Sequence, residues 1–85
     1  MSTSLQQTLD PEELRSFVAD VLDLEPASLT DDANFVSELG MDSLKALEVM
    51  VALEKKYQIN ITEDEVKDMT NFGDVRDLVS SKLAA

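Results

Sequence analysis

Hydrophobic residues recur at the three- and four-residue spacing of an α-helix in four segments of the chain. The first segment opens at Asp10, a favoured type of helix N-cap followed by a proline, and its pattern ends at Pro26. The second segment runs from Ser43 to Tyr57. Between them, residues 27–41 combine turn-forming residues with isolated large apolar side chains, which predicts a long loop pinned to the core. These apolar side chains are Leu29, Phe35, Val36 and Leu39.

The last two segments begin at helix-capping residues. Thr62 and Glu65 form the capping-box pair of a short third helix that reaches about Met69, and Asn71 can cap a fourth helix. No strand alternation of useful length appears, although residues 57–61 could form a short extended piece. The sequence therefore predicts an all-α fold: a small four-helix bundle of three longer helices and a short third helix, with a long loop between helices 1 and 2. The apolar positions of the fourth helix are Val75, Leu78, Val79 and Leu83.

The length of the chain allows one domain. Its 85 residues must share a single core, and a hydrophobic fraction of 44% suits a folded protein. We expect residues 1–9 to form a flexible N-terminal tail and residues 10–85 to form the folded domain. No apolar run approaches membrane-spanning length, and the N-terminus lacks the basic start and apolar segment of a signal peptide. These features predict a cytoplasmic protein.

Charge and missing residue types narrow the possible functions. The formal net charge of -11 would repel phosphate backbones and anionic membranes, so we expect no nucleic acid and no membrane among the partners. Basic protein surfaces are better partners for a chain that we expect to be a monomer. With no cysteine and no histidine, the chain lacks disulfides, thiolate metal ligands and the commonest general base. We expect neither a metal site nor a catalytic residue.

The segment 43–57 carries apolar residues on two faces of the predicted helix. One face consists of Ala46, Val49, Met50, Leu53 and Tyr57. The other consists of Leu44, Leu47 and Val51, at spacings of three and four residues. One apolar stripe is enough to bury a helix in a bundle of this size. The second stripe is therefore either covered by the long loop or exposed for a partner or ligand.

Ser43 lies in the stretch GMDSL, where the predicted loop meets the second helix, and its hydroxyl has three possible roles. Considered from the residues alone, the favoured role is a helix cap, because Asp and Ser are preferred there. A nucleophile needs a positioned base, and Lys45 lies about 200° around the helix from Ser43. The third role is attachment, since a phosphodiester on this serine would meet free backbone N–H groups and the positive end of the helix dipole.

These residues resemble the phosphopantetheine-dependent acyl carrier proteins, whose signature is Asp-Ser-Leu at the start of the second helix of a four-helix bundle. Asp42, Ser43 and Leu44 match that signature. The resemblance extends over "NFVSELGMDSL", "LEVMVALEKKY" and "ITEDEVKDMTNFGDV", and only the N-terminal tail lies outside it. It implies a discrete carrier of the polyketide or fatty-acid type.

The resemblance also implies a role for each matching residue. Ser43 would carry the phosphopantetheine arm, with Asp42 and Leu44 beside it, and Asp42 would help to position the transferase that installs the arm. The arm would bring the thiol that the chain lacks. The carrier would not be an enzyme, because ketosynthases, acyltransferases or acyl ligases would do the chemistry. The surface for these partners would comprise Leu44, Lys45, Leu47, Glu48 and Val51.

The second helix departs from the family pattern in its charge. Fatty-acid carriers of this family usually have a strongly acidic second helix, whereas three lysines and two glutamates give residues 43–57 a net charge of +1. Lys45 and Met41 favour a carrier for polyketide or specialised fatty-acid biosynthesis. A peptidyl or aminoacyl carrier of the same fold, a housekeeping fatty-acid carrier and an unmodified helical adaptor remain as alternatives.

Overall fold

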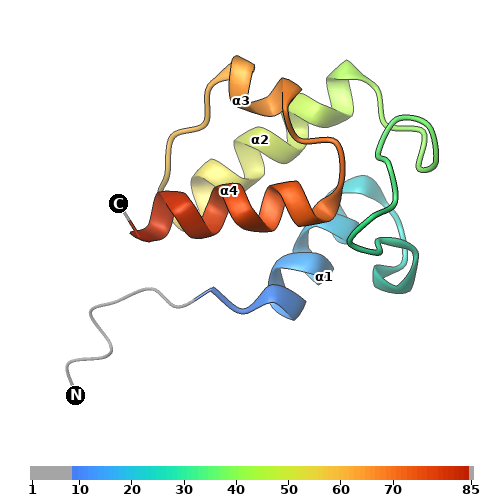
Figure 1. Cartoon of the computed structure of the whole chain (residues 1–85), viewed down its shortest axis with the longest axis horizontal. Helices are drawn as coiled ribbons and strands as arrows, with labels where there is room; N and C mark the ends of the chain where they lie inside the picture. The colour runs from blue at the N-terminus through green and yellow to red at the C-terminus, as the bar shows by residue number, and fades with distance from the viewer. Residues whose placement is uncertain (1–8, 85) are drawn as a thin grey trace.

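Four α-helices and one short 3-10 helix form the regular structure of residues 9–84, which are the residues that the computed structural model describes (Figure 1). They are α1 (Pro11–Leu22), η2 (Pro26–Ser28), α2 (Ser43–Tyr57), α3 (Glu63–Lys67) and α4 (Phe72–Ala84). The predicted all-α fold is confirmed, and no strand occurs within residues 9–84. Apart from residue 9, the predicted N-terminal tail lies outside the described residues.

The helices begin where the capping residues predicted. Asp10 accepts hydrogen bonds from the backbone N–H groups of Glu12 and Glu13 at 3.0 and 3.3 Å. Thr62 caps α3 in the reciprocal arrangement of a capping box. The Oδ1 atom of Asn71 accepts from the N–H of Asp74 at 2.9 Å, at the start of α4. These caps lie within three residues of their partners, so a sequence reveals them readily.

Two helix ends differ from the prediction. Helix α1 stops at Leu22, earlier than Pro26, because Asp23 adopts a left-handed conformation with φ 61° and closes the helix. Helix α3 stops at Lys67, earlier than Met69. The N–H groups of Asp68 and Met69 donate to carbonyl oxygens three residues earlier, those of Glu65 and Val66, so the α-helical pattern ends there, and Met69 lies buried in the core.

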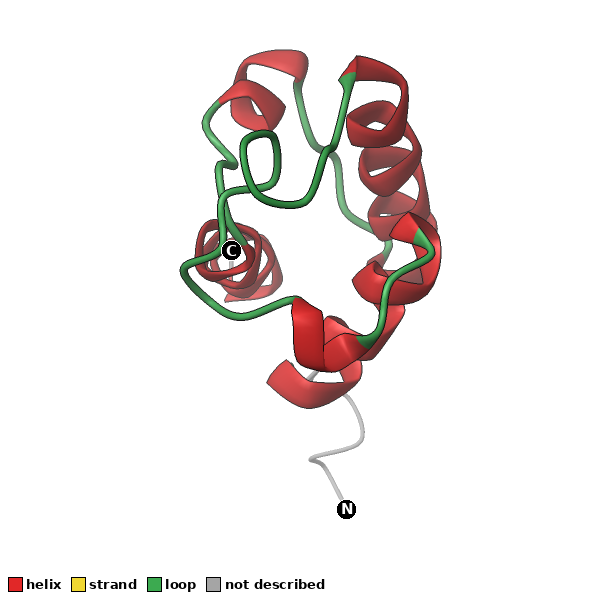
Figure 2. Cartoon of the chain, turned by 90° about the vertical axis from the view of Figure 1, so that its right-hand side faces the viewer, coloured by secondary structure: helices red, strands yellow, loops and turns green. Residues whose placement is uncertain are grey.

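The core is formed by side chains from α1, α2 and α4, from the long loop, residues 23–42, that joins α1 to α2, and from Ile61 and Met69 on either side of α3. Figure 2 views α4 nearly end-on and shows the helices arranged around this common interior. Leu29 and Phe35 of the loop are buried, as predicted. Val36 is 68% exposed, so its predicted place in the core is wrong. The N–H groups of Val36 and Ser37 both donate to Asn34 Oδ1 at 2.9 Å, so Asn34 holds this part of the loop in a turn.

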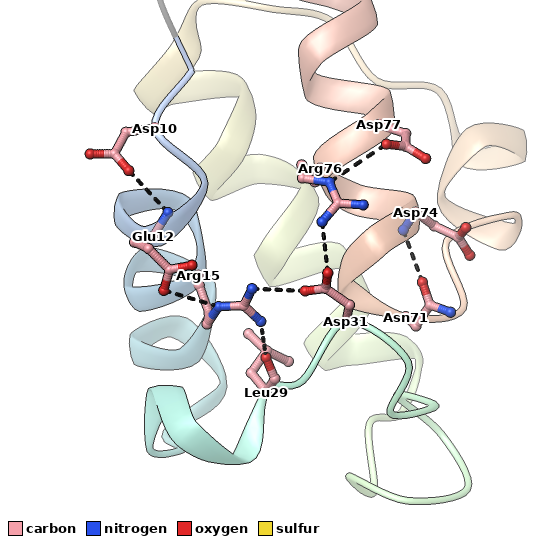
Figure 3. Close-up of polar contacts among 9 residues, drawn as sticks. All are labelled: Asp10, Glu12, Arg15, Leu29, Asp31, Asn71, Asp74, Arg76 and Asp77. Carbon is pink, nitrogen blue, oxygen red and sulfur yellow. Dashed lines mark hydrogen bonds and ion pairs between the residues drawn. The ribbon is translucent and has the colours of Figure 1, made fainter.

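The long loop is fastened to the helices by polar contacts that centre on Asp31 (Figure 3). Asp31 accepts from Arg15 of α1 at 2.7 Å and from Arg76 of α4 at 2.8 Å. The backbone O atom of Asp31 accepts from the N–H of Gly73 at 3.1 Å, and Arg15 also donates to the backbone O of Leu29. These contacts therefore fix the path of the loop between α1 and α4.

None of the helices in the described residues is long and apolar enough to cross a membrane.

Candidate functional site

Ser43 is the first residue of α2, and its side chain is exposed. Asp42, the preceding residue, is the helix cap: its Oδ1 atom accepts from the backbone N–H of Lys45 at 2.9 Å. The capping role favoured for Ser43 is therefore wrong. Among the side-chain hydrogen bonds of residues 9–84, none uses the Ser43 hydroxyl. The hydroxyl is free for another role.

The backbone around Ser43 suits an attached anion. The first N–H groups of a helix have no acceptor one turn earlier, and the side chain of Asp42 satisfies only that of Lys45. The N–H groups of Ser43 and Leu44 remain for an oxygen atom of a phosphodiester, at the positive end of the helix dipole. An exposed hydroxyl beside unpaired donors fits the attachment of a phosphopantetheine arm, the group that the resemblance implied.

Lys45 does not serve as a base for Ser43. Its Nζ atom lies 3.7 Å from Oε1 of Glu48, one turn further along α2. Both side chains are about half exposed, so their ion pair contributes little to stability. It does neutralise the acidic contact that Glu48 would otherwise present. The first turns of α2 therefore carry no net charge from this pair, whereas the loop that precedes them is acidic.

A cleft of about 720 Å³ lies beside Ser43. Three parts of the chain form its walls: the end of the long loop, the first two turns of α2, and α3 with the residues that follow it. Most of the surface that lines the cleft is apolar, and Met41, Leu47, Val66 and Met69 contribute to it. Any group attached to the Ser43 hydroxyl starts at the mouth of an apolar cleft.

The second apolar stripe of α2 is exposed. Leu44 is 65% exposed, Leu47 is 40% exposed and Val51 is 43% exposed. The opposite face is buried through Val49, Leu53 and Tyr57. The long loop does not cover the stripe, because it is fastened towards α1 and α4 instead. Of the two alternatives left open by the sequence, the structure shows an exposed surface.

The structure brings some of the predicted site residues together and separates others. Asp42, Ser43 and Leu47 line the cleft, whereas Leu44, Lys45, Glu48 and Val51 do not. The sequence reasoning missed Val36 of the loop and the wall that comes from Val66, Lys67 and Met69, in and after α3. Only the tertiary packing of α3 against the start of α2 reveals this wall, since these segments lie far apart in the sequence. Val36 carried a signal, because it stood out as an apolar residue in the loop.

Comparisons with known proteins show which proteins this chain resembles. A family model described as "Phosphopantetheine attachment site" matches residues 12–80. The chain is 46% identical over 83 residues to the polyketide-8 synthase acyl carrier protein 2 of Streptomyces avermitilis, a match that covers 98% of this chain and 95% of that protein. It is 36% identical over 74 residues to an acyl carrier protein of Helicobacter pylori, covering 86% of this chain and 95% of that one.

Two solved structures have the same fold. A putative acyl carrier protein from Mycobacterium tuberculosis superposes with a TM-score of 0.76 at 26% identity, over 85% of this chain and 97% of that chain. The solution structure of a holo acyl carrier protein from Geobacter metallireducens gives a TM-score of 0.74 at 31% identity, over 87% and 85% of the two chains.

Proposed function

This chain belongs to the phosphopantetheine-dependent acyl carrier proteins, and from that premise we propose that Ser43 is the residue that bears the arm. One observation carries the assignment: the Ser43 hydroxyl is exposed and unbonded at the start of α2, while the neighbouring Asp42 does the capping. The arm supplies the thiol on which an acyl group is held as a thioester. The polypeptide has no cysteine that could do this.

Each residue near the attachment point has a distinct role in this proposal. Asp42 fixes the first turn of α2 and so holds the Ser43 hydroxyl outward, towards the transferase. The N–H groups of Ser43 and Leu44 face the phosphodiester oxygens. The cleft offers apolar surface to the atoms nearest the tether. The protein itself has no catalytic residue in this scheme, and its mechanism is to present the acyl group to other enzymes.

The exposed stripe of α2 is the proposed contact surface for these enzymes. Leu44, Leu47 and Val51 would bury apolar area against a partner, with Lys45 and Glu48 at the edge. The partners are a phosphopantetheinyl transferase and then ketosynthases, acyltransferases or acyl ligases. The cytoplasmic location and the monomeric state expected from the sequence stay predictions.

A polyketide pathway is the proposed setting. The similarity to a polyketide synthase acyl carrier protein at 46% identity supports it, as does the net positive charge of α2, which three lysines and two glutamates produce. A specialised fatty-acid pathway is the second candidate, because carriers with the plain acyl carrier name also match across most of the chain. Both settings require the same modification of Ser43.

Intact mass tests the attachment directly. Purified protein is incubated with coenzyme A and a phosphopantetheinyl transferase, and we expect a mass gain of one phosphopantetheine. Ser43→Ala should abolish this gain. Ser80→Ala, which changes an exposed serine of α4, should leave it intact. If the wild-type protein gains no mass while a known carrier in the same reaction does, the proposal is wrong and the chain acts as an unmodified helical adaptor.

A further inference from the structure

The cleft beside Ser43 contains one positively charged side chain, Lys67, which comes from the last turn of α3. Among the ion pairs of residues 9–84, none uses Lys67. Glu63, one turn earlier in α3, also lines the cleft, but the two side chains are not within ion-pair distance. Lys67 is exposed at the edge of the cleft, and its ammonium group has no partner among the described residues.

Three of the other polar side chains that line the cleft are already engaged. The Thr70 hydroxyl donates to Asp74 at 2.7 Å. The carbonyl oxygen of the Asn34 side chain accepts from two backbone N–H groups, those of Val36 and Ser37. Asp42 is occupied by its capping hydrogen bond. Lys67 therefore provides the strongest free donor beside walls that are otherwise largely apolar.

The charges of the lining restrict the kind of acceptor that suits this donor. Two carboxylates, Asp42 and Glu63, line the cleft with the single ammonium of Lys67. A negatively charged ligand would be repelled by the two carboxylates and attracted only by the ammonium group of Lys67. A neutral ketone oxygen accepts a hydrogen bond from the ammonium without that repulsion. A plain alkyl chain contacts the apolar walls and leaves the donor unused.

We propose that Lys67 makes the cleft selective for acyl groups that carry a ketone, over plain alkyl groups of the same length. This inference rests on the proposed function, because the acyl group must first be tethered at Ser43. Hydrogen bonds to charged donors are stronger than neutral ones, so the ketone should raise the ratio of inserted to free acyl group by about tenfold.

The test compares two acyl groups on the same carrier. The protein is loaded with a hexanoyl arm or with its 5-oxo derivative, using the matching coenzyme A thioesters, and intact mass verifies the loading. NMR then follows the backbone resonances of Val66 and Met69, which line the cleft, relative to the unacylated holo-protein. The wild-type protein should show larger shifts with the 5-oxo group than with the hexanoyl group.

Three variants assign that difference to its cause. Lys67→Met keeps the length of the side chain but removes the charge and the donors, and it should make the two acyl groups indistinguishable. Lys67→Arg keeps a cationic donor and should retain the difference. Lys55→Met removes an exposed lysine of α2 that does not line the cleft, and it should behave as the wild type. Each comparison is made within one variant, so any small change in the stability of α3 cancels.

The outcomes separate this inference from the proposed function. If loading succeeds but the 5-oxo and hexanoyl groups give equal shifts in the wild-type protein, the selectivity of the cleft is disproved and the carrier function stands. If the difference persists in Lys67→Met, a ketone preference exists but Lys67 does not cause it, which also overturns the inference. Failure to load Ser43 at all would refute both.

Discussion

Asp31 shows how a single side chain can hold a long loop in place. Its two carboxylate oxygens each accept from a different arginine, Arg15 of α1 and Arg76 of α4 (Figure 3). The hydrogen bond from Arg15, followed by that from Arg76, holds the pKa of Asp31 below its ordinary value of 3.8. The guanidinium of Arg15 also lies 4.4 Å from the centre of the Phe72 ring. One carboxylate therefore joins three segments of the chain.

Acid should weaken this junction. Because the pKa of Asp31 is lowered in the folded protein, its contribution to stability is complete above the ordinary value of 3.8 and is lost as the pH falls through the lower folded value. We expect Asp31→Asn to melt below the wild type at neutral pH, and the gap to narrow as the pH drops below 3.8. Thermal melts of both proteins across a pH series measure that gap.

Asp32→Asn provides the matched control for this prediction. Asp32 is the next residue, is exposed, and takes part in none of the ion pairs of residues 9–84. Its removal relieves the same negative charge without breaking the junction, so its melting temperature should equal or exceed that of the wild type. Equal melting temperatures for Asp31→Asn and Asp32→Asn at neutral pH would show that the arginine contacts do not stabilise the fold.

At the residue scale, contacts between residues close in the sequence could be predicted, whereas contacts between residues far apart in the sequence could not. The capping contacts of Asp10 and Thr62 span two or three residues, and their residue types alone predicted them. Arg76 and Asp31 are 45 positions apart, in a chain with many possible acidic partners. Charge type cannot choose among those partners, so the junction had to be found in the structure. The same limit explains why Lys67 was not recognised as a neighbour of Ser43.

At the scale of elements, α2 serves both the core and the surface. Its buried face contains Leu53, which is fully buried, whereas Val51 on the other face is 43% exposed. Helical periodicity predicted both stripes and the bounds of the helix, because a buried stripe and two end signals define a helix well. Periodicity could not decide whether the second stripe was covered. That depended on the path of the long loop, which the Asp31 junction sets.

Two truncations on α2 should separate its roles. Leu53→Ala should lower the free energy of unfolding by about 2–5 kcal/mol, because it leaves a cavity in the core. Val51→Ala should change it by about 0.5 kcal/mol or less, as is usual for exposed positions. Val51→Ala should nevertheless slow acyl transfer to a partner enzyme if the exposed stripe is the contact surface. Denaturant titration and transfer kinetics of the holo-protein give the two measurements.

The same pair of variants can refute the role of the stripe. A loss of stability in Val51→Ala as large as that in Leu53→Ala would mean that the stripe contributes to the core. An unchanged transfer rate, together with unchanged stability, would mean that partners bind elsewhere. Neither result would count against the attachment of the arm at Ser43. Ser43 and the capping residue Asp42 lie at the start of α2, away from Val51.

At the scale of the whole molecule, the fold must tolerate a strong excess of negative charge. The 18 acidic and 7 basic residues leave a formal net charge of -11. Some of the acidic residues are compensated locally: Glu65 of α3 lies 2.9 Å from Lys82 of α4, and the first turn of α3 places acids at the positive end of its dipole. Glu63, Asp64 and Asp68 are exposed on the same short segment and occur in no ion pair of the described residues. Self-repulsion therefore opposes the compact state.

Salt should relieve this repulsion. At physiological ionic strength the Debye length is about 8 Å, so repulsion between exposed carboxylates on the same face is reduced. We expect the melting temperature to rise from low to physiological salt. Millimolar magnesium or calcium should raise it further by weak binding to carboxylates. Within residues 9–84 no group of three or more suitable ligands comes together, so this effect would not reflect a dedicated metal site.

Modification of Ser43 should respond to salt in the opposite direction. The loop that leads to Ser43 carries the exposed acids Asp32, Glu38 and Asp42, which would attract a basic surface on the phosphopantetheinyl transferase. Screening weakens that attraction, so the rate of mass gain should fall over the same salt series in which the melting temperature rises. A control reaction with a neutral small acceptor would reveal any direct effect of salt on the transferase. If the melting temperature stays flat or falls with salt, self-repulsion does not limit this fold. If the rate does not fall, the acidic loop does not guide the transferase to Ser43.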